Sequence, residues 1–116
     1  MVWEQRMEIL LKDVICRVKD DTERRLPDTH RFSPIGCGLR IPDTEFVAYI
    51  IVQCDAQNQH GRRMCVRVVK QGTDLAYEQI FPEMTSSEIR RFLADPQAYP
   101  QIRQAVDELL ARIQDQ

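Results

Sequence analysis

Cys37 is the residue whose type and setting best suit catalysis. It lies between Gly36 and Gly38, and Asp28 and His30 are close by in the chain. A nucleophilic cysteine needs a nearby base and a lowered pKa, and flanking glycines let a substrate approach the backbone closely. Cys37 and His30 are therefore the candidate catalytic pair. A cysteine in a glycine-relaxed edge strand explains the same residues, because neighbouring Cys and His arise easily by chance.

Metal chemistry has little support in the spacing of ligand residues. Structural zinc usually draws its ligands from close pairs, and no two cysteines here are two residues apart. We therefore expect no metal and no cofactor, and we interpret His60 as a polar hairpin-tip residue. The potential ligands are Cys16, Cys37, Cys54, Cys65, His30 and His60.

Residues 56–73 form the one strongly basic stretch, since they contain Arg62, Arg63, Arg67 and Lys70 and no acidic residue. Arg62 and Arg63 are candidate contacts for phosphates or for an acidic partner. A solvated hairpin, whose charges protect a sheet edge from aggregation, is the alternative explanation. A formal net charge of −2 and the lack of interleaved aromatic residues argue against nucleic acid as the ligand.

These residues are placed by a predicted β-hairpin over 46–54 and 64–69. Both runs are rich in β-branched residues, which suit a pleated, buried strand. The tip at 58–61 ends in glycine and predicts a three-residue loop, which would pair Val52 with Val68. In that register one face of the hairpin is wholly apolar and forms the core.

The outer face of the hairpin is also partly apolar, which is unusual for a sheet with one wet face. Two explanations are open: helices cover both faces, or a second subunit covers the outer one. The second explanation gives four candidate interface residues. They are Tyr49, Ile51, Val69 and Ile80.

The other elements follow from apolar spacing and turn residues. Gly72-Thr73 predicts a two-residue type II′ turn that sets Arg67 opposite Glu78. Thr85 and Glu88 have the spacing of a capping box. The expected elements are an amphipathic helix over 2–25, a short edge strand over 35–41, a third hairpin strand over 74–81, a helix that starts at the capping box, and a last helix from Tyr99-Pro100.

Together these elements predict one α+β domain over residues 1–116, with an N-terminal helix, an antiparallel meander of three or four strands, and two C-terminal helices. This order of elements is similar to that of small acidic secretion chaperones, which are dimers that hold other proteins. That similarity implies a protein-binding role.

The sequence as a whole therefore indicates a non-enzymatic interaction or chaperone-like protein, with another protein or a second copy as its partner. The compact chain is typical of a small bacterial protein. The N-terminal residues lack the apolar core of a signal peptide, so we expect a reducing cytoplasm and no membrane partner. A small enzyme or ligand-binding domain that uses Cys37 and His30, and a weak nucleic-acid binder that uses Arg62 and Arg63, are the alternatives.

Overall fold

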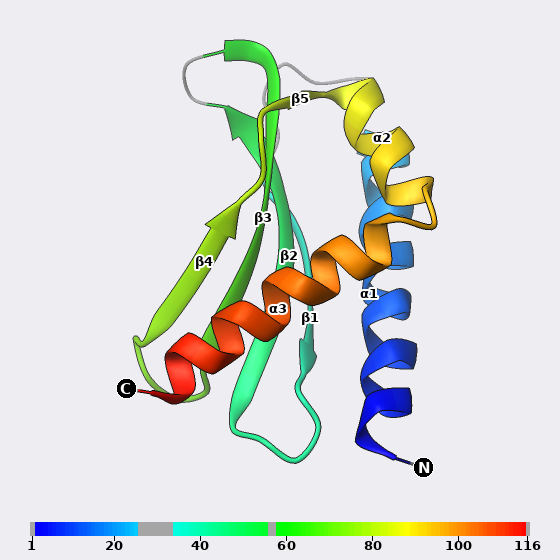
Figure 1. Cartoon of the computed structure of the whole chain (residues 1–116). Coiled ribbons are helices and arrows are strands. Elements are labelled where there is room, and N and C mark those ends of the chain that lie inside the picture. The colour runs from blue at the N-terminus through cyan, green and yellow to red at the C-terminus, as the bar shows by residue number, and fades with distance from the viewer. Residues whose placement is uncertain (1, 26–33, 56–57, 116) are drawn as a thin grey trace.

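The computed structural model describes residues 2–25, 34–55 and 58–115. It is an α+β fold in which an N-terminal helix precedes an antiparallel sheet and two further helices follow it (Figure 1). The elements are α1 (Trp3–Arg25), β1 (Ile35–Arg40), β2 (Phe46–Asp55), β3 (Asn58–Lys70), β4 (Ala76–Ile80), β5 (Met84–Thr85), α2 (Ser86–Ala94) and α3 (Ala98–Gln114).

The sheet is a meander in the order β1-β2-β3-β4, and the short β5 pairs with the start of β3. β1 and β4 are therefore the edge strands of the path. The expected short strand at 35–41 is confirmed as the β1 edge, and the expected strand at 74–81 is confirmed as β4.

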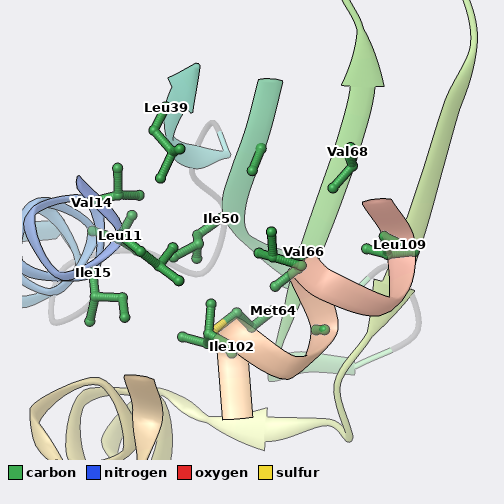
Figure 2. Packing of buried hydrophobic residues seen from close by; sticks show 14 of the residues in the cluster. Leu11, Val14, Ile15, Leu39, Ile50, Met64, Val66, Val68, Ile102 and Leu109 are labelled. Atoms are coloured by element: carbon green, nitrogen blue, oxygen red, sulfur yellow. The ribbon is translucent and has the colours of Figure 1, made fainter. Parts of the chain in front are cut away.

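All three helices pack on one face of the sheet, and the core lies between the two layers (Figure 2). Complete burial of a large apolar side chain contributes about 1.5–3 kcal/mol, so this layer is the main source of stability. Leu11 and Val14 of α1 and Ile102 and Leu109 of α3 face the sheet, where they meet Leu39, Ile50, Met64, Val66 and Val68. The apolar hairpin face predicted from the sequence is therefore the core face.

The register of the main hairpin differs from the prediction. Val52 pairs with Met64 rather than with Val68, and Asp55 pairs with Asn58. Pairing with β2 thus extends along β3 as far as Asn58, so the predicted three-residue loop ending at Gly61 is wrong. From Phe46 to Cys54, each β2 residue pairs four residues earlier in the chain than expected. An even shift returns every side chain to the same face, which is why the apolar face was still predicted correctly.

The turn between β3 and β4 also differs from the prediction, although the predicted register of these two strands is correct. The amide of Lys70 donates to the carbonyl of Leu75, so four residues and not two connect the strands. Thr73 N–H donates to the carbonyl of Lys70, so residues 70–73 form a β-turn. Gly72 is the third residue of this turn and has a positive φ of 78°. Arg67 lies opposite Glu78, as predicted.

The two long helices are joined by a network around Arg103, whose side chain is only 12% exposed. Its guanidinium donates to Asp107 at 2.9 Å and to the Tyr99 hydroxyl at 3.1 Å, and it also reaches Glu4. Burial disfavours the charged form, but these hydrogen bonds outweigh it and hold the pKa of Arg103 above its usual range. The network ties α3 to the first turn of α1.

The helix boundaries follow the sequence signals. Thr85 is the N-cap of α2 and forms the complete capping box with Glu88, as predicted. Leu10 of α1 lies next to the buried side of that helix but is itself 37% exposed. The core side of α1 is instead filled by residues at stricter helical spacing. They are Met7, Leu11, Val14, Ile15 and Val18.

Candidate functional site

The face of the sheet opposite the helices is the first candidate site, and we call it the open sheet face. Side chains from β2, β3 and β4 form it in cross-strand rows. No described helix covers this face (Figure 1), so the first explanation for the apolar outer face, that helices cover both faces of the sheet, is wrong for the described residues. The open sheet face consists of Val47, Tyr49, Ile51, Cys65, Arg67, Val69, Ala76, Glu78 and Ile80.

The predicted interface residues all lie on this face. Tyr49 is 38% exposed and Ile80 is 49% exposed, whereas Ile51 and Val69 are half-buried. Large apolar side chains with this much exposure on one uncovered sheet face are typical of a contact surface. Whether a partner covers them stays a prediction.

An ion pair lies in the middle of the open sheet face. Nε and Nη2 of Arg67 donate to the same oxygen of Glu78, at 3.2 and 2.9 Å. Tyr49 flanks Arg67 on the other side in the same row. Both charged side chains are about 40% exposed, so solvent screens the pair and its contribution to stability is at most about 1 kcal/mol. Its effect is to neutralise the centre of an otherwise apolar surface.

Cys65 lies beside this ion pair and is buried. Burial, helped by the nearby Glu78 carboxylate and opposed by Arg67, raises the pKa of the Cys65 thiol. A raised pKa leaves the thiol protonated at neutral pH, so Cys65 is a packing residue rather than a nucleophile.

Tyr49 also covers a glycine on the neighbouring strand. Gly38 pairs with Tyr49, and a Cβ atom at Gly38 would lie 2.6 Å from Cε1 of the tyrosine ring. The absence of a side chain at Gly38 is therefore what allows the ring to lie over β1. Gly36 faces Ile51 with more room, since a Cβ there would be 3.6 Å from the nearest isoleucine atom.

Three hollows meet at Cys37 on β1. One of about 610 Å³ opens on the open sheet face, between β1 and the Tyr49–Ile51 stretch of β2. Two others, of about 580 and 270 Å³, lie between β1 and α1. Arg17 of α1 lines both of these. β1 is thus hollowed on both of its sides.

Of the candidate pair Cys37 and His30, only Cys37 lies in the described part of the chain. Cys37 is half-buried and packs against the core on the helix side of β1. His30 and Asp28 lie outside the described residues, and so does the side chain of His60. The charged groups that line the larger α1-side hollow with Cys37 are Arg17, Asp20, Asp21 and Arg24.

The arginine candidates are less exposed than a solvated hairpin would require. Arg62 is buried, and its Nη1 donates to the carbonyl of Gly61, while Arg63 is half-buried opposite Gln53. Contact between these arginines and an anion stays a prediction and depends on Arg63. Within residues 2–25, 34–55 and 58–115, no three His, Cys, Asp or Glu side chains gather as a metal site would need.

Sequence reasoning missed three features of this region: the ring of Tyr49 over Gly38, the hollows beside β1, and the contribution of α1 to them. The contact between Tyr49 and Gly38 had a usable signal in the alternating residues of the two strands, because a large aromatic residue opposite a glycine is a favourable cross-strand pair. The hollows depend on how α1 crosses β1, which has no local signal.

No described helix is both long enough and apolar enough to cross a membrane. Comparisons with protein-family models, with curated proteins and with solved structures find no match to this chain.

Proposed function

We propose that this chain is a non-enzymatic interaction protein that uses its open sheet face to bind protein, with a second copy of itself as the first partner. The observation that carries the proposal is the exposure of Tyr49 and Ile80 on a sheet face that no described helix covers. An aromatic residue, aliphatic residues and an arginine are the residue types enriched in the centre of protein interfaces.

The charge pattern supports the same proposal. Arg67 and Glu78 already neutralise each other within one chain, so their burial against a partner leaves no unpaired charge. Cys16, Cys37 and Cys65 are free thiols, which fits a reducing cytoplasm as the place where this binding occurs.

The test is sedimentation over a wide concentration range with two matched variants. Ile80→Lys places a charge on the open sheet face, and Ile9→Lys places one on the outer side of α1, where Ile9 is similarly exposed at 56%. We expect the unmodified chain to form dimers at high concentration, Ile80→Lys to weaken the dimer about ten-fold or more, and Ile9→Lys to leave it unchanged.

Two outcomes would contradict the proposal. One is a monomer at every concentration, and the other is equal weakening by both lysine variants. Circular dichroism of each variant would first establish that it is folded, since both positions are exposed and should accept lysine.

A further inference from the structure

The outer edge of β1 presents backbone groups that pair with no strand in the described part of the chain. Ile41 N–H donates to the carbonyl of Phe46, so residues 39, 37 and 35 also direct their N–H and C=O groups to β2. The backbone groups of Gly36, Gly38 and Arg40 therefore point away from the sheet. These are donors and acceptors that an additional strand could pair with.

β1 has only some of the devices by which proteins protect a sheet edge. It is short, Arg40 is its one charged residue, and α1 packs beside it, but it has no lysine or proline and its register with β2 runs without a bulge through every pair. The other edge strand, β4, instead carries Glu78 in an ion pair with Arg67. The two edges of the sheet thus differ in how ready they are to accept a strand.

From these observations we propose that β1 binds an extended peptide segment of another protein as an added antiparallel strand. The inference goes beyond the proposed function, because it assigns a role to the backbone groups of the β1 edge, although side chains of the added strand would also contact the neighbouring part of the open sheet face. The two hollows between β1 and α1 and the hollow on the open sheet face leave room for side chains on both sides of an added strand.

The hollows also specify which side chains the peptide should carry. Peptide residues that pair with Gly36 and Gly38 direct their side chains to the open sheet face. Because Tyr49, Ile51 and Val69 line the hollow there, these peptide side chains should be apolar. The alternate residues face hollows lined by the charged Arg17, Asp13 and Asp20 of α1 and, in the smaller hollow, also by Leu10 and Val14, so small polar side chains such as threonine should fit there. A strand with alternating apolar and polar residues fits both sides.

A second copy of β1 fits this site less well than such a peptide. In a β1–β1 pair, the residues opposite Gly36 and Gly38 would again come from a strand that presents glycines to the open sheet face. The hollow lined by Tyr49 would then stay unfilled. The partner is therefore a peptide that supplies apolar side chains at these positions.

The probe is a short synthetic peptide in which valine alternates with threonine between terminal lysines, labelled for fluorescence anisotropy. Two N-methylated forms provide the matched comparison. In an antiparallel pair the valines that enter the open-face hollow also donate their N–H groups to Gly36 and Gly38. We expect methylation of the valine amides to abolish binding, and methylation of the threonine amides to leave it intact.

Gly36 offers a matched pair of protein variants. Its N–H points away from β2, so Gly36→Pro removes an edge donor without breaking the sheet, while Gly36→Ala keeps the donor and adds a Cβ that has room. We expect Gly36→Pro to weaken peptide binding about ten-fold or more, and Gly36→Ala to bind as the unmodified chain does. Bound peptide should also slow amide hydrogen exchange at Gly38.

Equal affinities for the two methylated peptides, or for the two Gly36 variants, would overturn the proposal, as would no binding of the unmethylated peptide. A dimer that Gly36→Pro dissociates would assign the edge to a second copy instead. Ile80→Lys separates this test from that of the proposed function, because Ile80 lies on β4, across the sheet from the peptide, and its change should leave peptide binding unaltered.

Discussion

Glycine at position 38 is required by a neighbouring ring rather than by the backbone. The structure gives Gly38 no unusual backbone angle, but the ring of Tyr49 occupies the space where a side chain would be. Packing of an aromatic ring over a glycine in the adjacent strand compensates for the weak strand propensity of the glycine. The same contact fixes Tyr49 on the open sheet face.

We predict that Gly38→Ala destabilises the fold by about 1 kcal/mol, because the new methyl group pushes the ring of Tyr49 off β1. Gly36→Ala is the matched control and should be neutral or slightly stabilising, since a Cβ there makes an ordinary contact and alanine reduces the entropy of the unfolded chain. Urea unfolding measures both changes.

A double-mutant cycle identifies the cause. If the ring is responsible, Gly38→Ala should cost much less stability in a Tyr49→Ala background than in the unmodified chain. An equal cost in the two backgrounds would mean that the strand backbone, and not Tyr49, requires the glycine.

At the scale of elements, the sequence predicted most of the fold and little of the site. Apolar spacing and the Thr85 capping box were enough for the helices, because each signal is local. The hairpin register was not predictable in this way. Registers that differ by an even number of residues bury the same side chains, so the pattern in β2 and β3 does not distinguish Val52–Met64 from Val52–Val68.

Gly61 shows why the turn was misplaced. A glycine at this position resembled a loop signal, but Gly61 lies inside β3, where it is buried and pairs with Thr85 of β5. Glycine in a strand often marks the close approach of another backbone, and β5 is that backbone. The partner is more than twenty residues away in the chain, so no local pattern could have indicated it.

The capping box gives the start of α2 a pH dependence. The backbone N–H of Thr85 donates to the Glu88 carboxylate at 2.9 Å, which, with the Thr85 side chain, lowers the pKa of Glu88 below its ordinary value of 4.5. Because the pKa of Glu88 is lower in the folded chain than in the unfolded chain, its carboxylate stabilises the fold fully at pH values above the unfolded-state pKa. This stabilisation is lost as the pH falls through the folded-state pKa.

We therefore predict that the stability difference between the unmodified chain and Glu88→Gln is largest near neutral pH and shrinks as the pH falls below the ordinary pKa of 4.5. Urea unfolding at a series of pH values measures it. Asp74→Asn, a change at an exposed turn carboxylate outside the capping box, is the control for the loss of one negative charge. A constant difference between the chain and Glu88→Gln at all pH values would contradict the prediction.

At the scale of the molecule, Trp3 connects parts of the chain that are far apart in sequence. Its indole N–H donates to the carbonyl of Pro42 at 2.8 Å, in the turn between β1 and β2. The guanidinium of Arg103 lies 5.4 Å from the centre of its ring and brings α3 to the same place. One side chain thus contacts an N-terminal helix, a sheet turn and a C-terminal helix.

This arrangement makes Trp3, the single tryptophan of the chain, a probe of whether the fold is one cooperative unit. We predict that urea unfolding followed by Trp3 fluorescence and by far-ultraviolet circular dichroism gives coincident transitions, with a slope of about 1–2 kcal/mol per molar urea.

Arg103→Met should move both unfolding transitions together to lower urea concentration, because it leaves the partners of a mostly buried arginine unpaired. Arg17→Met, which removes an exposed ion pair with Asp13, should move neither by much. A fluorescence transition that precedes the loss of circular dichroism would instead mean that the α1–α3 junction opens before the sheet, and that the chain is not the single domain that its length and composition predict.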